Sequence, residues 1–540
     1  MTRKVNVAIL LDNKEIFLWE YRILEELIRS GCSNIRLLIN NNVEYPKLRN
    51  QHFPIFYLLH EKLDRLIFRN KFDFDNKVNV LERITELHVI ELINGRIKGD
   101  LITDDQNSIK NYNLDIILNF GLAPINGDLL KVCKLGALTY SISNHTNRST
   151  SPSCYWEVVK KMPEIEAVIK LVNDDPTKET VIYRTGISPY PNSINVNRNN
   201  IYGFASLLIP RIINGISKNG YSFLEELMKN NDNVIESSNY SDLHYPSSYQ
   251  AFSNLILLFT NYIIKKFWHK KTERWFLIIN NNDKNEIPLA NFGSFKEIKA
   301  PKDKFWADPF VISKDKHHYL FIEEYLIKAG KAHISVLKLD NKFNLLSCEK
   351  ILEKSYHISY PHIIKHDGSY YMIPESGSNN TIGIYKCTDF PYRWDFVMNL
   401  MENIPARDST LFFYNSKWWL FSSVIVMNCP TMSFSELFLY YSDDLLSSNW
   451  QSHPKNPIVS DHKISRPAGN LFLNNDKIYR PSQDCSGHYG KALNISCITK
   501  LSEAEYEEVL VKKIEPTWNK KLKGTHTYNF DDKVIVMDVF

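Results

Sequence analysis

One short stretch, Phe305-Trp306-Ala307-Asp308-Pro309-Phe310-Val311-Ile312, decides the fold of the C-terminal half of this chain. Four related stretches follow at spacings of roughly 50–60 residues, at positions 359–364, 406–412, 465–472 and 524–528. Each begins with polar or charged residues and continues as an apolar strand, and a turn and a second apolar strand come after it. Five such repeats predict a five-bladed β-propeller, because a small sheet of this kind buries its faces only against its neighbours.

The turns between the paired strands agree with this interpretation. They contain residues that tolerate the backbone of a tight hairpin, namely Asp315, Asp367-Gly368, Asn415, Asn474-Asn475-Asp476 and Asp531-Asp532. The apolar segment 275–279 precedes the first repeat, and we expect it to be an outer strand that closes the ring.

The composition limits the kind of protein. With 540 residues the chain is too long for one hydrophobic core, so two or three domains are expected. A net charge of +4 is ordinary for a soluble protein and gives no reason to expect a nucleic-acid partner. The eight cysteines include no Cys-x-x-Cys pair, and no His/Cys cluster has zinc-ligand spacing. We therefore expect free thiols in a reducing, cytoplasmic compartment and no metal site.

The N-terminal part alternates apolar strands with helical patterns, which indicates an α/β domain with a mostly parallel sheet. No G-x-G-x-x-G loop follows the first strand, so a dinucleotide cofactor is not expected. Taken together, the patterns divide the chain into an α/β domain at 1–190, a helical or linker region at 191–272 and the propeller at 273–540.

The α/β domain resembles the N-terminal domain of the formyltransferase family. The resemblance rests on the order of Asn119-Phe120-Gly121, a helix, Gly136-Ala137-Leu138 and a loop ending in Tyr155-Trp156-Glu157. It implies a Rossmann-type fold and, if the domain is active, a formyl-tetrahydrofolate donor. In that family an Asn polarises the formyl carbonyl, while a His and an Asp manage protons.

The positions that match this family site depart from its pattern. The strand after the Gly-Ala step carries Thr139 and Ser141, where the family has Asn and His. The candidates for a shifted site are Asn144, His145 and Asp174. The alternative is a degenerate domain in which these residues belong to a polar surface loop.

Polar residues at the openings of innermost propeller strands are expected to meet at one end of the central channel. The candidate catalytic residues are Asp308, Asp408 and Glu375, because carboxyl groups accept and donate protons. The candidate substrate-binding residues are His362, Arg407, Arg466, Arg480, Asp484, His488, His526 and Trp306. Arginines bind phosphate and aromatic faces cover sugar rings, so this set predicts a sugar or sugar-phosphate ligand. The alternative is structural, with Asp308 organising a turn and Arg407 and Asp408 bracing a blade.

Two resemblances concern the propeller. Trp306-Ala307-Asp308-Pro309 and Arg407-Asp408 are similar to stretches of five-bladed glycosidases, in which an Asp of the first blade is base or nucleophile. Over roughly 275–540 the closer resemblance is to the N-terminal propeller of glucosamine inositolphosphorylceramide transferases. It rests on Tyr440-Tyr441-Ser442-Asp443-Asp444-Leu445 and Arg466-Pro467-Ala468-Gly469. This resemblance implies a glycan or glycolipid context.

The segment 253–271 is apolar and aromatic, with its basic residues gathered at one end. It predicts either an interfacial helix on a membrane surface or a helix packed between the two domains. The protein is accordingly expected to be cytoplasmic, and peripheral to a membrane if the first interpretation holds.

The leading hypothesis is a transferase acting on a sugar, sugar-phosphate or glycolipid headgroup in surface-glycan biosynthesis, with a sugar, sugar phosphate or nucleotide sugar as its partner. One alternative is N-formylation of an amino sugar by the first domain. Another is a non-catalytic glycan-binding scaffold. A glycosidase ranks below these, because the acid–base pair matches that pattern poorly.

Overall fold

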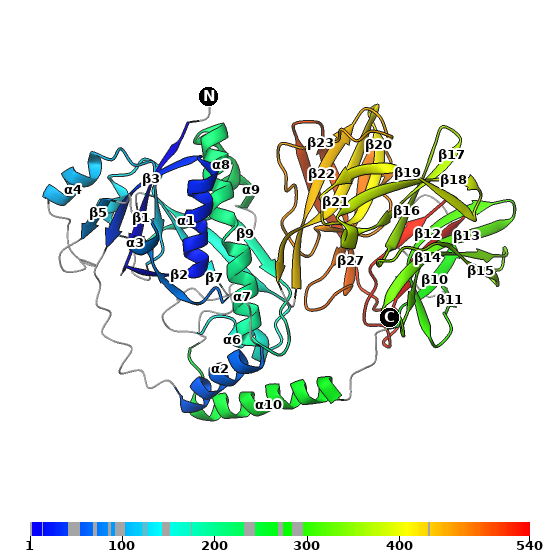
Figure 1. Ribbon diagram of the computed structural model, residues 1–540, viewed down its shortest axis with the longest axis horizontal. Helices are drawn as coiled ribbons and strands as arrows, with labels where there is room; N and C mark the ends of the chain where they lie inside the picture. The colour runs from blue at the N-terminus through cyan, green and yellow to red at the C-terminus, as the bar shows by residue number, and fades with distance from the viewer. Residues whose placement is uncertain are drawn as a thin grey trace. The chain divides into compact units, whose positions relative to one another are not determined.

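The computed structural model describes residues 3–12, 14–40, 54–68, 73–84, 88–91, 103–121, 125, 127–142, 152–173, 175, 177–231, 244–267, 274–282, 295–429 and 432–540. The chain forms two compact units (Figure 1). The first comprises Met1–Phe267 with the short segment Cys429–Met432, and the second comprises Trp268–Asn428 and Ser433–Phe540.

The first unit is built on a seven-stranded mixed sheet. In sheet order the strands are β5 (His88–Glu91), β3 (Ser33–Asn40), β1 (Val5–Leu11), β6 (Ile116–Asn119), β7 (Ala137–Ile142), β8 (Ile165–Val172) and β9 (Glu179–Ile187). The strands from β5 to β7 pair in parallel, and β8 and β9 are antiparallel. Strand β1 lies in the middle of the parallel part, where both faces are covered, which explains its nearly continuous apolar sequence. The mixed sheet with helices agrees with an α/β domain, while the formyltransferase-like fold stays a prediction.

The described helices of the first unit follow the strands or form its C-terminal part. They are α1 (Leu18–Ser30), α2 (Ile55–Ile67), α3 (Val80–Arg83), α4 (Thr103–Lys110), α5 (Gly127–Leu130), α6 (Tyr155–Val159), α7 (Ile194–Ala205), α8 (Leu208–Asn219), α9 (Ser222–Asn231) and α10 (Ser248–Phe267). A short ribbon joins β2 (Glu15–Phe17) to β4 (Lys77–Asn79). Helices α7 to α10, which come from the expected connecting region, belong to this unit.

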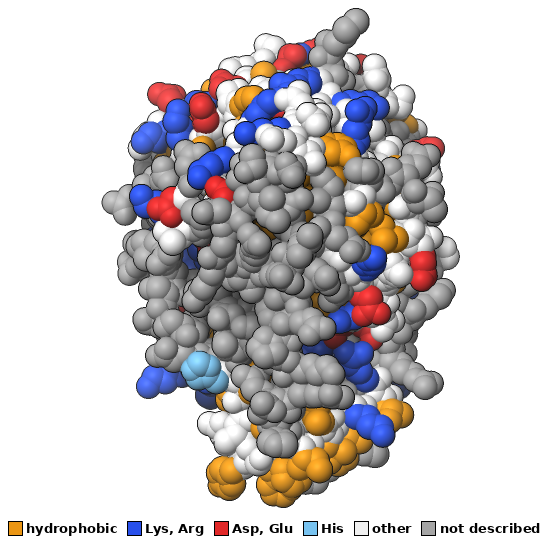
Figure 2. All heavy atoms as spheres, turned by 90° about the vertical axis from the view of Figure 1, so that its left-hand side faces the viewer, with side chains coloured by type: hydrophobic (Ala, Val, Ile, Leu, Met, Phe, Trp, Pro, Cys, Tyr) orange, Lys and Arg blue, Asp and Glu red, His pale blue; other side chains and the backbone are white. Residues whose placement is uncertain are grey.

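Hydrophobic side chains gather at the lower end of the molecule in Figure 2, where Figure 1 shows α2 and α10. None of the helices in the described ranges is long and apolar enough to span a membrane.

The second unit is the predicted five-bladed propeller, built from five antiparallel sheets. The strands of each blade are given from the innermost outward. The first blade contains β12 (Lys304–Lys314), β13 (His317–Leu326), β14 (Lys331–Leu339) and β15 (Leu345–Leu352), and the second contains β16 (Ser359–His366), β17 (Ser369–Glu375), β18 (Thr381–Asp389) and β19 (Arg393–Glu402). The third contains β20 (Ala406–Tyr414), β21 (Lys417–Cys429), β22 (Met432–Ser442) and β23 (Gln451–Ser452), and the fourth contains β24 (Arg466–Pro467) with β25 (Phe472–Asn474), β26 (Lys477–Asp484), β27 (Ala492–Leu501) and β28 (Tyr506–Ile514). The fifth contains β29 (Tyr528–Phe530), β30 (Val534–Val539), β10 (Phe276–Asn281) and β11 (Lys296–Ile298).

The first hairpin of four blades closes through a two-residue loop with a left-handed backbone. Both loop residues have positive φ in each case, for example Asp367 (47°) with Gly368 (73°) and Asn415 (50°) with Ser416 (59°). This conformation matches the twist of the flanking strands and favours Asn, Asp and Gly. The repeat pattern in the sequence therefore predicted these hairpins from their turn residues.

The ring is closed by pairing the two ends of the unit. Strand β10 pairs with β30 on one side and β11 on the other, so the last blade combines strands from both ends of the propeller sequence. Leu277 and Ile279 of β10 are fully buried in the core that this blade shares with the first blade.

Candidate functional site

The innermost strands of the first three blades share one irregularity. Asp308, Tyr360 and Asp408 have left-handed backbones, with φ of 50°, 43° and 49°. The strand register shifts at each of these points. Non-glycine residues seldom adopt this conformation, and bulges of this kind redirect side chains next to functional sites. The repeats are thus equivalent in backbone geometry as well as in sequence.

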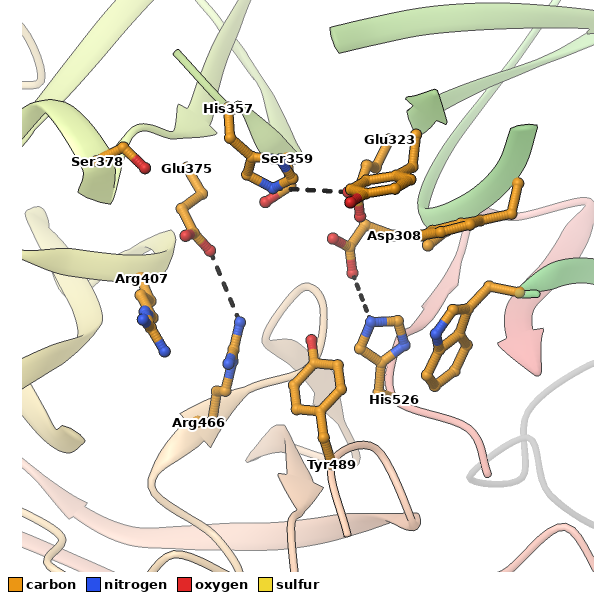
Figure 3. A pocket seen from close by; sticks show the side chains of 14 residues that line it. Asp308, Glu323, His357, Ser359, Glu375, Ser378, Arg407, Arg466, Tyr489 and His526 are labelled. Atoms are coloured by element: carbon orange, nitrogen blue, oxygen red, sulfur yellow. Dashed lines mark ion pairs between the residues drawn. The ribbon is translucent and has the colours of Figure 1, made fainter. Parts of the chain in front are cut away.

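A cavity of about 340 Å³ opens in the propeller beside these bulges (Figure 3). Its lining is polar and carries both signs of charge, with an aromatic edge. The lining residues are Trp275, Phe305, Ala307, Asp308, Glu323, Tyr325, His357, Ser359, Glu375, Ser378, Arg407, Arg466, Tyr489 and His526.

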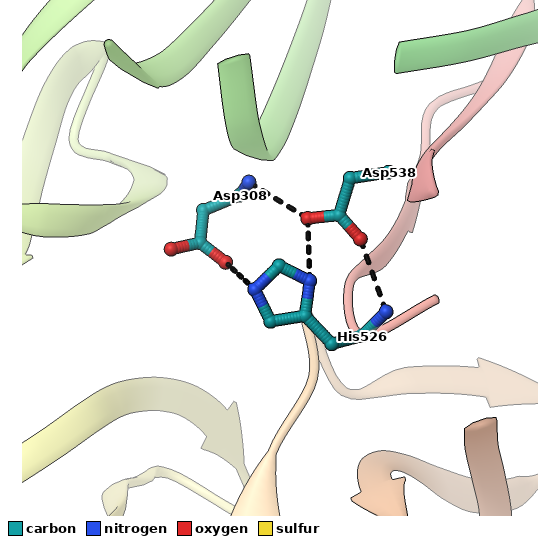
Figure 4. A group of neighbouring side chains, drawn as sticks. All are labelled: Asp308, His526 and Asp538. Atoms are coloured by element: carbon teal, nitrogen blue, oxygen red, sulfur yellow. Dashed lines mark hydrogen bonds and ion pairs between the residues drawn. The ribbon is translucent and has the colours of Figure 1, made fainter. Parts of the chain in front are cut away.

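Three buried residues form a chain behind one wall of this cavity (Figure 4). His526 Nδ1 lies 2.8 Å from Asp538 Oδ2, and His526 Nε2 lies 3.4 Å from Asp308 Oδ1. Asp538 also accepts hydrogen bonds from the backbone N–H groups of Asp308, His526 and Thr527. Asp308 accepts from Thr527 Oγ1 at 2.8 Å and from the backbone N–H of Tyr360. The imidazole is therefore held between two carboxylates.

This chain sets the protonation of Asp308. Burial raises the pKa of Asp308 to about 6, the His526 charge opposes the shift, and the Asp408 charge adds to it. Burial alone would lower the pKa of His526, but Asp538 and Asp308 outweigh it and raise this pKa. Near neutral pH Asp308 is therefore an ionised carboxylate close to its titration point, which suits a general base.

Asp308, His526 and Asp538 also have the residue types of a metal site. Both Asp538 oxygens already accept backbone N–H groups, and both ring nitrogens of His526 face carboxylates. A metal ion would have to displace these contacts, so a proton relay explains the donor set better than a cation does.

A second acidic pair lies across the cavity. Asp408 is paired with Arg466 and accepts a hydrogen bond from Gln483. Burial alone would raise the pKa of Asp408, but Arg466 and a hydrogen bond from Glu375 lower it. Burial and the Asp408 charge raise the pKa of Glu375 to about 8. Glu375 therefore carries the proton of this pair at neutral pH, and its Oε2 accepts no hydrogen bond within the described ranges.

Arg407 lines the cavity as a second cation beside Arg466. Among the residues described by the structure, no carboxylate forms an ion pair with Arg407, whereas Arg466 contacts Asp408 and lies 3.7 Å from Glu375. Burial and the charge of Arg466 lower the pKa of Arg407. The ring of Tyr489 covers the Arg466 guanidinium at 4.9 Å. Two adjacent guanidinium groups with one local carboxylate partner make this wall attractive to an anion.

Glu323 adds another proton-bearing carboxyl group. Burial, with the charges of Asp308 and Glu375, raises the pKa of Glu323 well above its usual range. His357 Nε2 lies 3.6 Å from Glu323 Oε1.

The structure brings together Asp308, Glu375, Arg407, Arg466 and His526 of the expected site, and Asp408 supports them through Arg466. The other expected residues do not line the cavity, and each has a structural contact instead. Trp306 is buried and donates a hydrogen bond to Glu324, and His362 accepts one from the Leu411 N–H. Arg480 forms an ion pair with Glu508 at 2.5 Å, and Asp484 forms one with Lys513. His488 is exposed, and its ring contacts Phe540. Asn144, His145 and Asp174 lie outside the described residues.

Four contributors were not singled out from the sequence. Tyr489 comes from a loop after β26, Trp275 and His357 precede their strands, and Asp538 lies in β30 behind His526. Only Asp538 had a usable signal, as an isolated carboxylate within the buried run Val534–Val539.

The family match to known proteins lies in the propeller. Residues 277–538 match the family described as "Glucosamine inositolphosphorylceramide transferase 1, N-terminal". The protein of that name from Oryza sativa subsp. japonica is 33% identical over 225 residues, which is 40% of this chain and 30% of the relative. The Arabidopsis thaliana protein is 29% identical over 256 residues, 46% of this chain and 32% of the relative. The chain thus spans about a third of the length of these relatives, and the resemblance predicted for the propeller is confirmed.

Among solved structures, a family 117 glycoside hydrolase from Zobellia galactanivorans covers 49% of this chain and 90% of its own length. It is 10% identical with a TM-score of 0.32, a likeness too remote to support an argument.

Proposed function

We propose that this protein is a transferase acting on a sugar, sugar-phosphate or glycolipid headgroup, and that the propeller cavity is its acceptor site. The proposal rests on one observation: a single cavity combines the ionised Asp308, the protonated Glu375 and Arg407, which forms no ion pair with a described residue. Carboxyl groups with separated pKa values divide naturally into a base and an acid.

The chemistry follows from these positions. An acceptor hydroxyl gives its proton to Asp308 while its oxygen forms a bond to the anomeric carbon of a donor sugar. The bond from that carbon to the leaving-group oxygen breaks, and the oxygen takes the electron pair and the proton of Glu375. Asp538 holds the imidazole of His526 in place, and this imidazole stabilises the negative charge at Asp308.

The positive wall favours a ligand that carries a phosphate. Arg407 can bind such a group without breaking an ion pair within the described part of the chain, and Arg466 lies beside it. Trp275 and Tyr489 offer aromatic faces for a sugar ring at the cavity edge. The matched relatives are named transferases of inositolphosphorylceramide, a name that contains a phosphate-linked headgroup.

The test is turnover by the Asp308→Asn variant. Purified protein is incubated with nucleotide sugars and with inositol phosphates or phosphoinositol lipids as acceptors, and products are identified by mass spectrometry. Loss of the base should lower the rate by about 10²–10⁴-fold. The matched control is Asp315→Asn, the same change in a turn residue with almost the same φ of 49°, outside the cavity.

Retained turnover by Asp308→Asn would overturn the assignment of the base. Release of free sugar without an acceptor product would identify a hydrolase instead. Ligand binding without any turnover would support the scaffold alternative.

A further inference from the structure

Helices α2 and α10 of the first unit both expose apolar side chains to solvent. A surface helix normally directs its apolar stripe to the core and its polar stripe to water. Each of these two helices instead exposes several large apolar side chains. Such a surface requires a partner other than water.

Helix α10 shows this clearly. Exposed side chains recur at helical spacing and include Phe252, Ile256, Leu257, Ile263 and Ile264. Its inward side buries a smaller set, Ala251 and Leu258 among the described side chains. Asn254 donates to the Tyr155 hydroxyl at 3.0 Å. Between Ser248 and Phe267 the helix contains no Asp or Glu.

Helix α2 repeats the pattern. Ile55, Leu58, Leu59 and Leu66 are exposed, Ile55 by 73%. His60 and Asp64 of this helix are buried, whereas Lys62 is exposed beside the apolar side chains.

The inward residues of α2 are engaged by α7. Glu61 forms an ion pair with Arg198 at 2.7 Å, and Asp64 accepts from the Asn195 N–H at 2.7 Å. These buried polar contacts fix the rotation of α2, so its apolar stripe cannot turn away from solvent without breaking them.

The two helices form one continuous face. Phe56 of α2 contacts Phe252 of α10 with ring centroids 4.8 Å apart, and Phe68 contacts Tyr262 at 5.4 Å. The hydrophobic side chains along the lower edge of Figure 2 belong to this region. We call the exposed apolar side chains of α2 and α10 the α2–α10 face.

We propose that the α2–α10 face docks on an anionic lipid bilayer surface. The exposed side chains of α10 between 248 and 264 carry no charge. The sequence then continues Lys265-Lys266-Phe267-Trp268-His269-Lys270-Lys271, four lysines with aromatic residues between them. An uncharged apolar stripe that leads into a basic and aromatic segment matches the layers of an anionic membrane, with apolar groups in the acyl boundary and cations at the phosphates.

This inference is independent of the propeller cavity, although a membrane-bound protein would meet a glycolipid headgroup directly. A protein partner would also cover apolar side chains. A protein interface, however, places polar groups of both signs at its rim, whereas the segment 265–271 at and after the end of α10 carries only positive charges.

The test is flotation of the full-length protein with vesicles of phosphatidylcholine alone or mixed with phosphatidylglycerol. Wild-type protein should float with the anionic vesicles, and high salt should weaken this binding. The variant Leu59→Ser/Ile256→Ser/Ile263→Ser should lose it by about tenfold or more. The matched control is Val509→Ser/Leu510→Ser/Val511→Ser on β28, where three exposed apolar residues are removed elsewhere and binding should persist.

Thermal unfolding and sedimentation velocity on the same proteins complete the test. Because the substituted residues are exposed, the melting temperature should change little. Equal flotation of both triple variants would overturn the proposal, as would absence of flotation. Self-association of wild-type protein that only the α2–α10 variant abolishes, without vesicle binding, would assign the face to a second copy. The Asp308→Asn variant should float like wild type, so failure of this proposal and failure of the proposed function are distinguishable.

Discussion

At the scale of single residues, the cavity separates the protonation of its acidic side chains by their surroundings. Asp408 lies against Arg466 and stays ionised, whereas the neighbouring Glu375 is left without a full counter-ion and holds a proton. Two carboxyl groups that share a site cannot both ionise cheaply. The cavity therefore holds carboxyl groups of the same kind in different protonation states, and the neighbouring residues determine which group is ionised.

The proton on Glu375 should be visible in the pH dependence of stability. Its pKa rises from an ordinary 4.5 in the unfolded chain to about 8 in the folded protein. Between these values the folded state binds a proton that the unfolded state lacks, so raising the pH lowers the free energy of unfolding. Urea unfolding of wild type and Glu375→Gln at about pH 5 and about pH 8 measures this. The variant should lose less stability over the interval, and an equal loss in both proteins would contradict the protonated state.

Arg407 should contribute to ligand binding more than to folding. Its guanidinium has no ion-pair partner in the described ranges, so Arg407→Ala should leave the melting temperature nearly unchanged. The same change should weaken binding of sugar phosphates by about tenfold or more, because hydrogen bonds to charged groups contribute about 1.5–3 kcal/mol. Calorimetric titration checks this, with Arg393→Ala on β19, 74% exposed, as the control. An unchanged affinity would show that Arg407 does not bind the phosphate of the ligand.

At the scale of elements, the propeller depends on β10. This strand is distant in sequence from β29 and β30 but completes their blade. Its buried side chains join the core of the first blade, so β10 links the two ends of the ring.

Truncation of β10 should therefore be costly. Leu277 is fully buried, and Leu277→Ala should lower the free energy of unfolding by about 2–5 kcal/mol. Leu345→Ala on the outermost strand β15, where the side chain is 44% exposed, should cost no more than about 0.5 kcal/mol. Chemical unfolding of both variants measures the difference. Similar costs would mean that β10 does not hold the ring closed.

At the scale of the whole molecule, each of the two units has its own hydrophobic core. The first is centred on the parallel strands and the second is divided among the blades. Units with separate cores are able to unfold separately.

Calorimetry of the full chain should therefore show two transitions. Ile9 and Leu320 are fully buried in the first and second unit, and Ile9→Ala and Leu320→Ala should each move a different transition. A single transition displaced by both changes would show that the units unfold together.

The local parts of the fold were predictable because the signals for them are local. Asp367-Gly368 and Asn415 predicted hairpins, since only certain residues tolerate positive φ in two-residue loops. Repetition of the same strand–turn–strand pattern then indicated a propeller, and the apolar β10 segment its closing strand.

By itself, then, the sequence determined the five blades, their turns and the concentration of carboxyl and guanidinium groups on innermost strands. Only the tertiary structure decided which of those groups share the cavity. His362 and Arg407 lie in corresponding repeats, yet one is buried against Leu411 and the other lines the cavity. The physical reason is that alternate strand residues face opposite sides, and a bulge shifts that alternation by one residue. Tyr489 reaches the site from the loop between β26 and β27, and Asp538 from the closing blade, so their meeting depends on the assembled ring.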